Sequence, residues 1–168
     1  AITPISMKEY GYEKFTQEWN KKTVDIALKA AALPGREIAV AGSVSTSGSW
    51  DKLTTDEIKP GFTDQLNILS DAGVDLIILE AMTSKDETVE SIIECSSKIN
   101  LPIWLSISCA MNNEDRKLMH GYQESVTNSK AKFYDYLENS LTKFSQLHKG
   151  PILVAHSDIK VTREAIKI

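Results

Sequence analysis

A single carboxylate ends the most apolar stretch of the chain. Residues 73–81 read Gly-Val-Asp-Leu-Ile-Ile-Leu-Glu-Ala, so that Glu80 follows a nearly unbroken apolar run. A run this short and this apolar indicates a strand buried on both faces, as in parallel sheets flanked by helices. The carboxyl ends of such strands form the functional face of open sheets and of barrels. We expect Glu80 either to contact a ligand or to pair with a buried donor, and the ligand contact is favoured.

The other predicted strands also end in polar residues. They supply Ser6, Ser43, Ser106 with Ser108, and His156 with Ser157. This rim contains no second carboxylate and no serine in a nucleophile elbow, so glycoside hydrolysis and triad hydrolysis are both unsupported. Adjacent residues on a strand point to opposite faces, so only one of His156 and Ser157 can face a site. The catalytic residues stay unassigned.

The elements that must position these residues alternate between strands and helices. Strands are predicted at 1–6, 37–43, 73–81, 101–108 and 151–155, and helices at 13–33, 54–72, 84–96, 133–147 and from 161 onward. Units of ~25 to 45 residues in this order predict a parallel sheet with right-handed crossovers. Since neither a repeat nor a linker interrupts them, residues 1–168 are expected to form a single domain.

Helical spacing also predicts the buried faces and the helix starts. The expected core positions are Phe15, Trp19, Thr23, Ile26, Ala30 and Leu33 in the first helix, Ile58, Phe62, Leu66 and Leu69 in the second, and Val89, Ile92, Ile93 and Ser96 in the third. Thr54 or Thr55 can cap the second helix. Ser84 and Glu87 have the spacing of a capping box for the third.

Two segments lack a helical or strand pattern. Residues 44–50 are mostly small and could bring backbone N–H groups close to a substrate or phosphate, with a flexible loop as the alternative. Residues 109–128 show no clear period and are expected to form a mobile active-site flap or an irregular insertion. His120, within that segment, is expected to be solvated.

Bulk composition narrows the classes of function. A net charge of -4 over 168 residues offers no basic field for nucleic acid. No apolar stretch approaches the ~20 residues of a membrane span and the start lacks a signal-peptide pattern, so we expect a cytoplasmic protein. Cys95 and Cys109 form no C-x-x-C pair and are expected to be free thiols, with a disulfide as the alternative.

Beyond these patterns, three segments resemble the homocysteine S-methyltransferase family in order and in spacing. They are 39–43 (Ala-Val-Ala-Gly-Ser), 72–84 (AGVDLIILEAMTS) and 102–108 (PIWLSIS). Residues 2–6 and the helix with Trp19, Asn20 and Ala27 are similar to the family's second strand and the helix after it. The resemblance covers essentially the whole chain.

This resemblance implies an α/β fold of the eight-stranded barrel type, of which the chain would form about five strands. It also implies methyl transfer to the thiol of homocysteine, giving methionine, with a zinc ion on three cysteine thiolates activating that thiol. The methyl donor would be S-methylmethionine, S-adenosylmethionine, betaine or a methylfolate. Glu80 matches the family's strand-end glutamate, which contacts the amino group of homocysteine. Ser43, Ser6 and Ser106 are the further candidate substrate-binding residues.

The chain departs from the family at the zinc site. The family's first strand would precede Ala1, and its last two strands, with a paired-cysteine zinc motif, would follow Ile168. The remaining zinc cysteine corresponds to Ser157, whose hydroxyl is a poor ligand at neutral pH, while the adjacent His156 could ligate in principle. His156 with Cys109 would supply two ligands of the usual three or four.

These observations therefore leave three hypotheses for the fold and function of the chain. The chain is a methyltransferase seen as a fragment or degenerate copy, or a degenerate barrel that binds a small amino acid or a partner protein without zinc. An open flavodoxin-like sheet of five strands is the third alternative. An incomplete barrel would expose strand edges and part of its core, so we expect a homo-oligomer.

Overall fold

A parallel sheet forms the centre of the molecule. The computed structural model describes residues 3–33, 35–46, 53–123, 126 and 134–168. Within these ranges the parallel sheet has the order β1-β2-β3-β6, with β1 (Ala41–Ser45), β2 (Leu76–Met82), β3 (Ile103–Ile107) and β6 (Ile152–Val154). β4 (Cys109–Met111) and β5 (Leu118–His120) form an antiparallel pair beside it. The α/β class and the parallel sheet predicted from the sequence are confirmed.

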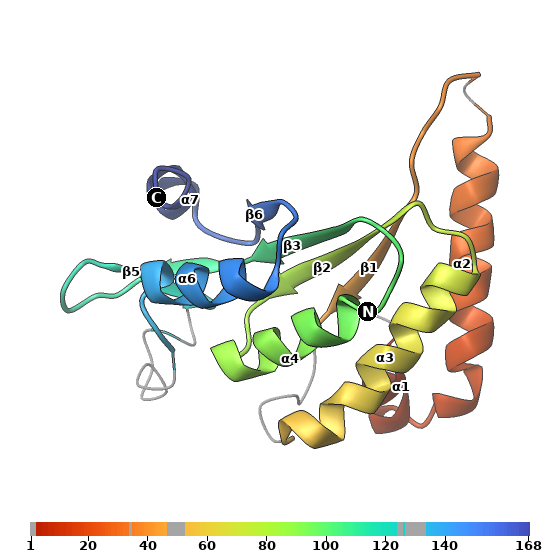
Figure 1. Cartoon of the computed structure of the whole chain (residues 1–168), viewed down its shortest axis with the longest axis horizontal. Helices are drawn as coiled ribbons and strands as arrows, with labels where there is room; N and C mark the ends of the chain where they lie inside the picture. Colours follow the sequence, from red (N-terminus) through yellow and green to blue (C-terminus); the bar gives the residue numbers. More distant parts are fainter. Residues whose placement is uncertain (1–2, 34, 47–52, 124–125, 127–133) are drawn as a thin grey trace.

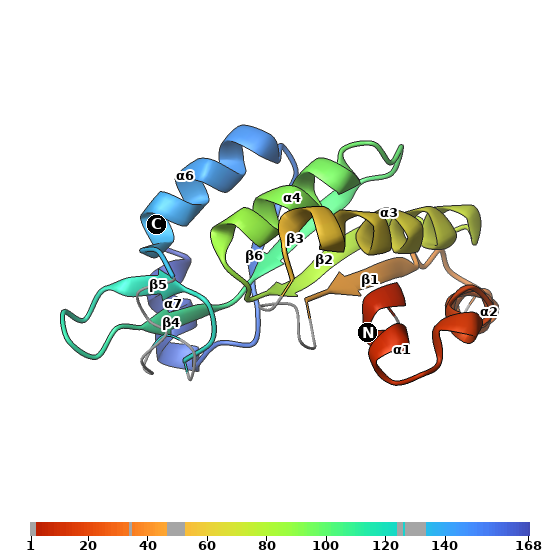
Figure 2. The ribbon, with the colours of Figure 1, turned by 90° about the horizontal axis from the view of Figure 1, so that it is seen from below.

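Three helices, α3, α4 and α6, cover one face of that sheet (Figures 1 and 2). The described helices are α1 (Pro4–Glu9), the 3₁₀ turn η1 (Glu13–Phe15), α2 (Thr16–Ala31), α3 (Thr55–Asp71), α4 (Asp86–Ser96), α6 (Leu137–Leu147) and α7 (Ile159–Ala165). Figures 1 and 2 show α3, α4 and α6 side by side along one face, whereas none of the described helices lies across the opposite face of β2 and β3. No described helix combines the length and the apolar character that crossing a membrane requires.

This one-sided cover explains the burial of β2. Ile77 and Leu79 point to the helix layer and are fully buried, whereas Ile78 and Glu80 alternate with them and are only partly covered. On the neighbouring strand Trp104 pairs in register with Ile78 and is 39% exposed. The prediction that residues 73–81 are buried on both faces is therefore wrong, because helices cover only one face of the sheet.

Helix α3 matches its sequence prediction closely. Thr54 is the N-cap, and Thr54 and Glu57 form a capping box. The predicted stripe is buried throughout, at Ile58, Phe62, Leu66 and Leu69. Gly73, with φ of 91°, adopts the left-handed conformation that lets the chain leave α3 and enter β2. The predicted core faces of α4, at Val89, Ile92, Ile93 and Ser96, are also buried.

The amino-terminal segment is a helix, not the end of a strand. Thr3 caps α1 by accepting a hydrogen bond from the backbone N–H of Ser6, and Pro4 follows at the first helical position. Proline suits that position because its fixed φ is already helical and the missing N–H would have no helical partner. The strand predicted at residues 1–6 is therefore wrong for residues 3–6, and residues 1 and 2 lie outside the described part.

The predicted core face of α2 is also wrong. Its buried residues are Thr16, Asn20 and Val24, whereas Ile26 is 58% exposed and Leu33, just after the helix, is 84% exposed. The inward face of α2 instead carries the buried Thr16, Asn20 and Val24, and Ala27, Leu28 and Ala31 pack against the core. The 13–33 helix itself is confirmed, as η1 followed by α2.

Two helix starts differ by small shifts. The N-cap of α4 is Lys85, and no side-chain cap hydrogen bond is present, so the capping box predicted for Ser84 and Glu87 does not form. Glu87 consequently falls at the second helical position, one short of the place a capping box requires. Helix α6 begins at Leu137, while Phe133 of the predicted helix lies outside the described residues.

Candidate functional site

The middle of β1, the end of β2 and the segment after β6 bring polar side chains together on the uncovered side of the sheet. The Ser43 hydroxyl, from β1, donates a hydrogen bond of 2.5 Å to Oε2 of Glu80 at the end of β2. Nε2 of His156, which follows β6, lies 4.0 Å from Oε1 of the same carboxylate. The Glu80 and His156 side chains are 47% and 54% exposed. We call Ser43, Glu80 and His156 the rim cluster.

The backbone next to Glu80 is irregular. The β2–β3 register shifts between Leu79 and Met82, which inserts one extra residue in β2 and forms a bulge. Ala81 has a φ of 50° and His156 a φ of 51°, the left-handed region that non-glycine residues seldom adopt. Such strain costs about 1–3 kcal/mol per residue and collects at ligand sites. Two of the three described non-glycine residues with positive φ thus belong to, or directly follow, the rim cluster.

The other predicted rim residues are placed differently. Ser106 lies on β3 in register with Leu153 and is almost fully buried. Ser108 is fully buried, and its hydroxyl has no hydrogen-bond partner among the described residues. Ser6 accepts a hydrogen bond from the Thr3 hydroxyl within α1 and does not end a strand. Residues 47–50 of the predicted small-residue loop lie outside the described part.

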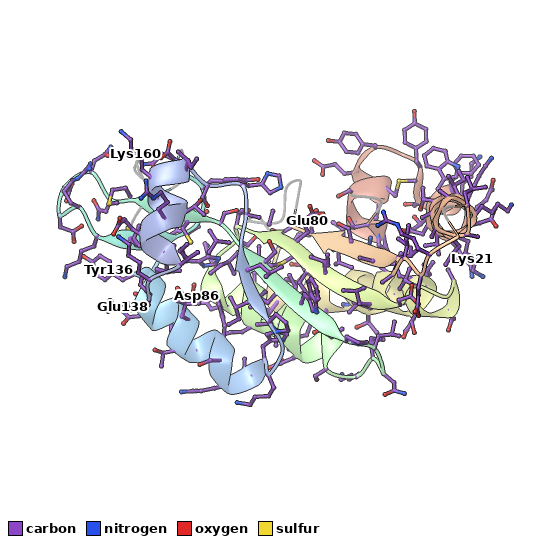
Figure 3. All side chains as sticks on the ribbon, turned by 90° about the horizontal axis from the view of Figure 1, so that it is seen from above. Lys21, Glu80, Asp86, Tyr136, Glu138 and Lys160 are labelled. Carbon is purple, nitrogen blue, oxygen red and sulfur yellow. The ribbon has the colours of Figure 1, made fainter. Side chains whose placement is uncertain are left out.

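A second polar cluster lies on the helix side of the β2 end, and the sequence analysis missed it. His120 is fully buried, with Nδ1 at 2.9 Å from Oδ1 of Asp86 and Nε2 at 2.8 Å from the Met82 carbonyl. Ser140 and Lys143 of α6 both donate to the Asp86 carboxylate. We call Asp86, His120, Ser140 and Lys143 the buried network; the first three are buried, and the Lys143 side chain is 44% exposed. Figure 3 shows Asp86 beside α6 and Glu80 on the uncovered side of the sheet.

The expectation that His120 is solvated is therefore wrong. The segment 109–128 contains the β4–β5 hairpin, which carries His120 over the end of β2, where the Phe144 ring meets it edge to face. The buried partners lie 34 and 38 residues away, so local periodicity gave no signal for them. One sequence feature could have indicated this cluster: Asp86 lies in the first turn of a predicted helix, shortly after the strand end that carries Glu80.

The charges of the buried network follow from its contacts. Burial alone would raise the pKa of Asp86, but hydrogen bonds from His120, Lys143 and Ser140 outweigh it and hold the pKa at about 2. Hydrogen bonds to Asp86 and Asp135 raise the pKa of Lys143. Both ring nitrogens of His120 face acceptors, and the Met82 carbonyl can only accept, so Nε2 carries the hydrogen of that contact.

A serine, a histidine and an aspartate meet here without forming a catalytic triad. In a triad the histidine lies between the other two and takes the serine proton. In this protein the aspartate is central, and the Ser140 hydroxyl donates to Asp86 rather than to His120. Ser140 is also fully buried, which leaves no approach for a substrate. The arrangement therefore serves packing and charge pairing.

Comparison with known proteins identifies the family. The family model of homocysteine S-methyltransferases matches residues 1–136, which is most of the chain. The chain belongs to the homocysteine S-methyltransferase family. A search of curated proteins finds no match. Among solved structures, the apo form of the homocysteine methyltransferase MmuM from Escherichia coli matches with a TM-score of 0.65 and 17% sequence identity.

The match to MmuM establishes the barrel-type fold of this family member. It covers 90% of this chain and 54% of the MmuM chain, so the protein spans about half the length of that structure. The four parallel strands with helices on one face correspond to part of a (β/α)₈ barrel, in which the face without helices is the barrel interior. The partial barrel predicted from the sequence is confirmed, with four parallel strands described instead of about five.

The described residues do not fit the zinc ion that the family implies. The Ser157 hydroxyl accepts a hydrogen bond from the Cys109 backbone N–H and donates one to the Ala155 carbonyl, so it ties two loops together. Burial raises the pKa of the Cys109 thiol to about 12, which opposes the thiolate that zinc binds. Within the described ranges no three His, Cys, Asp or Glu residues gather in a way that could hold a metal ion.

Both cysteines are free thiols, as predicted. Cys95 is buried on α4, and its thiol points to the Lys59 carbonyl at 3.9 Å. It behaves as a small packed residue, which agrees with the sequence analysis.

Proposed function

We propose that this chain provides the homocysteine-binding edge of a homocysteine S-methyltransferase, within a single domain spanning residues 1–168, and that it serves methyl transfer to the homocysteine thiol. The rim cluster is the observation that carries the proposal. A carboxylate near the end of a barrel strand, with one oxygen hydrogen-bonded to Ser43 and the other 4.0 Å from His156, suits the ammonium group of an amino acid. Membership in the family supports homocysteine as that amino acid.

The roles in this proposal follow from the contacts. Glu80 accepts N–H bonds from the substrate ammonium, and Ser43 fixes the orientation of the carboxylate through its 2.5 Å hydrogen bond. His156 provides a second polar group on the other side of the same carboxylate. Ser106 and Ser6 remain candidate substrate contacts, with Ser6 the weaker because it lies within a helix that packs on α3.

The methyl-transfer step requires the substrate sulfur as a thiolate nucleophile. Zinc supplies that activation in the family by lowering the thiol pKa. Since the described residues do not fit zinc, no step is derived through it, and any ligands would come from outside them. Conversion of homocysteine to methionine therefore stays a prediction of the family resemblance.

A second candidate function is amino-acid binding without catalysis. It is favoured by the Ser157 and Cys109 contacts, which leave neither residue as a zinc ligand. In this form the rim cluster binds the amino acid, or a partner protein, and no methyl group moves.

Calorimetric titration with homocysteine tests the binding site. We expect Glu80→Gln to weaken binding by about 30-fold, because a charge-assisted hydrogen bond contributes about 2 kcal/mol. Glu138→Gln, which removes an equally simple exposed carboxylate at the start of α6, is the matched control and should leave the affinity unchanged. Equal affinity for wild type and Glu80→Gln would remove Glu80 from the site.

Product analysis separates the two candidate functions. The chain is incubated with homocysteine, zinc and S-methylmethionine or S-adenosylmethionine, and methionine is measured by mass spectrometry. Methionine formation that is lost in Glu80→Gln supports the methyltransferase. Homocysteine binding without methionine formation supports the binding protein.

Assembly and location follow as further proposals. The strands β1 and β6 end the four-stranded sheet within the described residues, and the apolar residues Trp104 and Leu153 are partly exposed on its bare face. We therefore expect self-association, which light scattering measures as a mass of two or more chains. A single-chain mass would contradict it. A cytoplasmic location and the absence of a nucleic-acid partner stay predictions of the sequence.

A further inference from the structure

The buried network and the rim cluster meet at one short segment. Glu80 belongs to the rim cluster, and Met82, only two residues later, offers its carbonyl to the imidazole of His120 at 2.8 Å. Ala81 lies between them in the left-handed conformation. A contact on the helix side of β2 therefore fixes the backbone immediately after the candidate substrate-binding residue.

The contact between His120 and Met82 lies at the bulge in β2, so it can affect the direction of the side chains nearby. Leu79 pairs with Leu105 and Met82 with Ile107, so β2 uses three steps where β3 uses two. The extra residue turns the chain and re-aims the side chains beside it, which is a common use of bulges next to active sites. Since a left-handed alanine is unfavourable by itself, surrounding contacts must hold it. The Met82 carbonyl accepts from His120 at 2.8 Å and from the Ser108 backbone N–H at only 3.4 Å.

The surroundings of His120 leave its ring little freedom. Its backbone N–H donates to the Asp135 carbonyl, and β5 pairs it with Cys109. Its ring is fixed by Asp86 from α4 and by the edge-to-face contact with Phe144 of α6. An imidazole ring that is fully buried and held on three sides can act as a rigid donor through Nε2.

We propose that His120 is a positioning residue for the Glu80 site: its Nε2–H holds the Met82 carbonyl, maintains the bulge at Ala81 and so sets the direction of the Glu80 carboxylate toward Ser43 and the substrate. The identity of the ligand rests on the proposed function, whereas the contact between His120 and Met82 does not depend on it. His120 does not touch the substrate and acts only through the backbone of β2.

Two substitutions separate the two ring nitrogens. In His120→Gln the side-chain amide nitrogen can take the place of Nε2 and still donate to the Met82 carbonyl, while the contact with Asp86 is lost. In His120→Asn the amide takes the place of Nδ1, so it can donate to Asp86 but cannot reach Met82. Ser140→Ala is the control, because it removes a donor from Asp86 and leaves the Met82 contact in place.

Homocysteine affinity by calorimetry and thermal unfolding are measured for all four proteins. We expect all three variants to unfold at lower temperature, but only His120→Asn to lose affinity, by about tenfold, the equivalent of one neutral hydrogen bond. His120→Gln and Ser140→Ala should stay within about threefold of wild type. Equal affinity losses in His120→Asn and His120→Gln, in proportion to their loss of stability, would overturn the proposal.

A ligand-free measurement keeps the two proposals apart. The ¹³C resonance of the Glu80 carboxyl reports its hydrogen bond with Ser43, and it should move in His120→Asn and not in His120→Gln or Ser140→Ala. If wild type gives no heat with homocysteine, the proposed function fails, and this resonance alone decides the positioning role. An unmoved Glu80 resonance in His120→Asn would show that His120 does not position the carboxylate.

Discussion

Two polar clusters flank the end of the same strand, and they differ in almost every physical property. The rim cluster on the bare face of the sheet has half-exposed side chains, with one short hydrogen bond between Ser43 and Glu80 and a 4.0 Å separation between Glu80 and His156. The buried network on the helix side has an aspartate shared by a histidine, a serine and a lysine. Polar side chains near one strand end can thus have two roles: the satisfied, buried group stabilises the fold, and the accessible group has free hydrogen-bonding capacity, as the proposed binding site requires.

Removing the shared carboxylate of the buried network should have the largest effect. Asp86→Ala removes the acceptor that His120, Ser140 and Lys143 share, and loss of one partner of a buried pair costs about 3 kcal/mol of folding free energy. Urea unfolding measures this loss. Glu87→Gln, on the next residue and exposed to solvent, is the matched control and should change the stability by less than about 0.5 kcal/mol. Equal changes in the two variants would contradict the difference drawn between the clusters.

The second-largest effect is expected on acidification, which should reduce the stability that the Asp86 charge contributes. The folded-state pKa of Asp86 is about 2, below its ordinary value, so the unfolded state takes up the proton first. The contribution of Asp86 is therefore complete above pH ~4 and is lost as the pH falls toward about 2, on the order of 2 kcal/mol. We expect the stability gap between wild type and Asp86→Asn, measured by urea unfolding at several pH values, to shrink over that range. A gap independent of pH would show that the Asp86 charge contributes nothing.

Substitutions in the rim cluster should change the free energy of unfolding very little. Ser43→Ala removes a hydrogen bond between accessible groups, and surface changes of this kind usually stay within about 0.5 kcal/mol. We expect an unchanged urea midpoint together with weaker homocysteine binding. A destabilisation as large as that of Asp86→Ala would mean that Ser43 and Glu80 hold the sheet together, and the division between binding and folding clusters would be wrong.

The smallest effect is expected at Cys109, which lies between the two clusters. Its backbone N–H binds Ser157, and its thiol is buried with a pKa raised to about 12. A maleimide reagent at neutral pH should therefore leave Cys109 unmodified in the native protein and modify it in urea, as peptide mass spectrometry can measure. Rapid native modification would show an accessible thiolate and reopen the question of a metal ligand at this position.

Sequence reasoning reached the rim cluster because its signals are local. The apolar run of β2 ends at Glu80, the predicted strand 37–43 ends at Ser43, and the last strand runs into His156. Parallel strands place such ends at one edge, so the meeting of these residues followed from the topology. The boundaries of β1 moved by only a few residues, from 37–43 to Ala41–Ser45.

The buried network could not be predicted in this way. β4 and β5 have three residues each, too short for a period to appear, and the burial of His120 depends on residues more than 30 positions away. The error at residues 3–6 has a different origin. Thr3 followed by Pro4 is a helix-start signal, but the apolar neighbours Ile2 and Ile5 suggested a strand. The core face predicted for α2 was wrong because a barrel helix buries only the side that meets its neighbours, and the predicted apolar residues do not lie on that side.

The bare face of the sheet also gives the protein an optical reporter. Trp104 stands on that face in the row of Ser43 and Ile78, and its indole is partly in contact with water. Binding on this face would remove water from that indole and shift its emission to the blue. The bound group could be a second copy, a further chain or an amino acid with its methyl donor. Fluorescence of a variant that keeps Trp104 and replaces Trp19 and Trp50 by phenylalanine would thus follow occupation of the barrel interior directly, without a label.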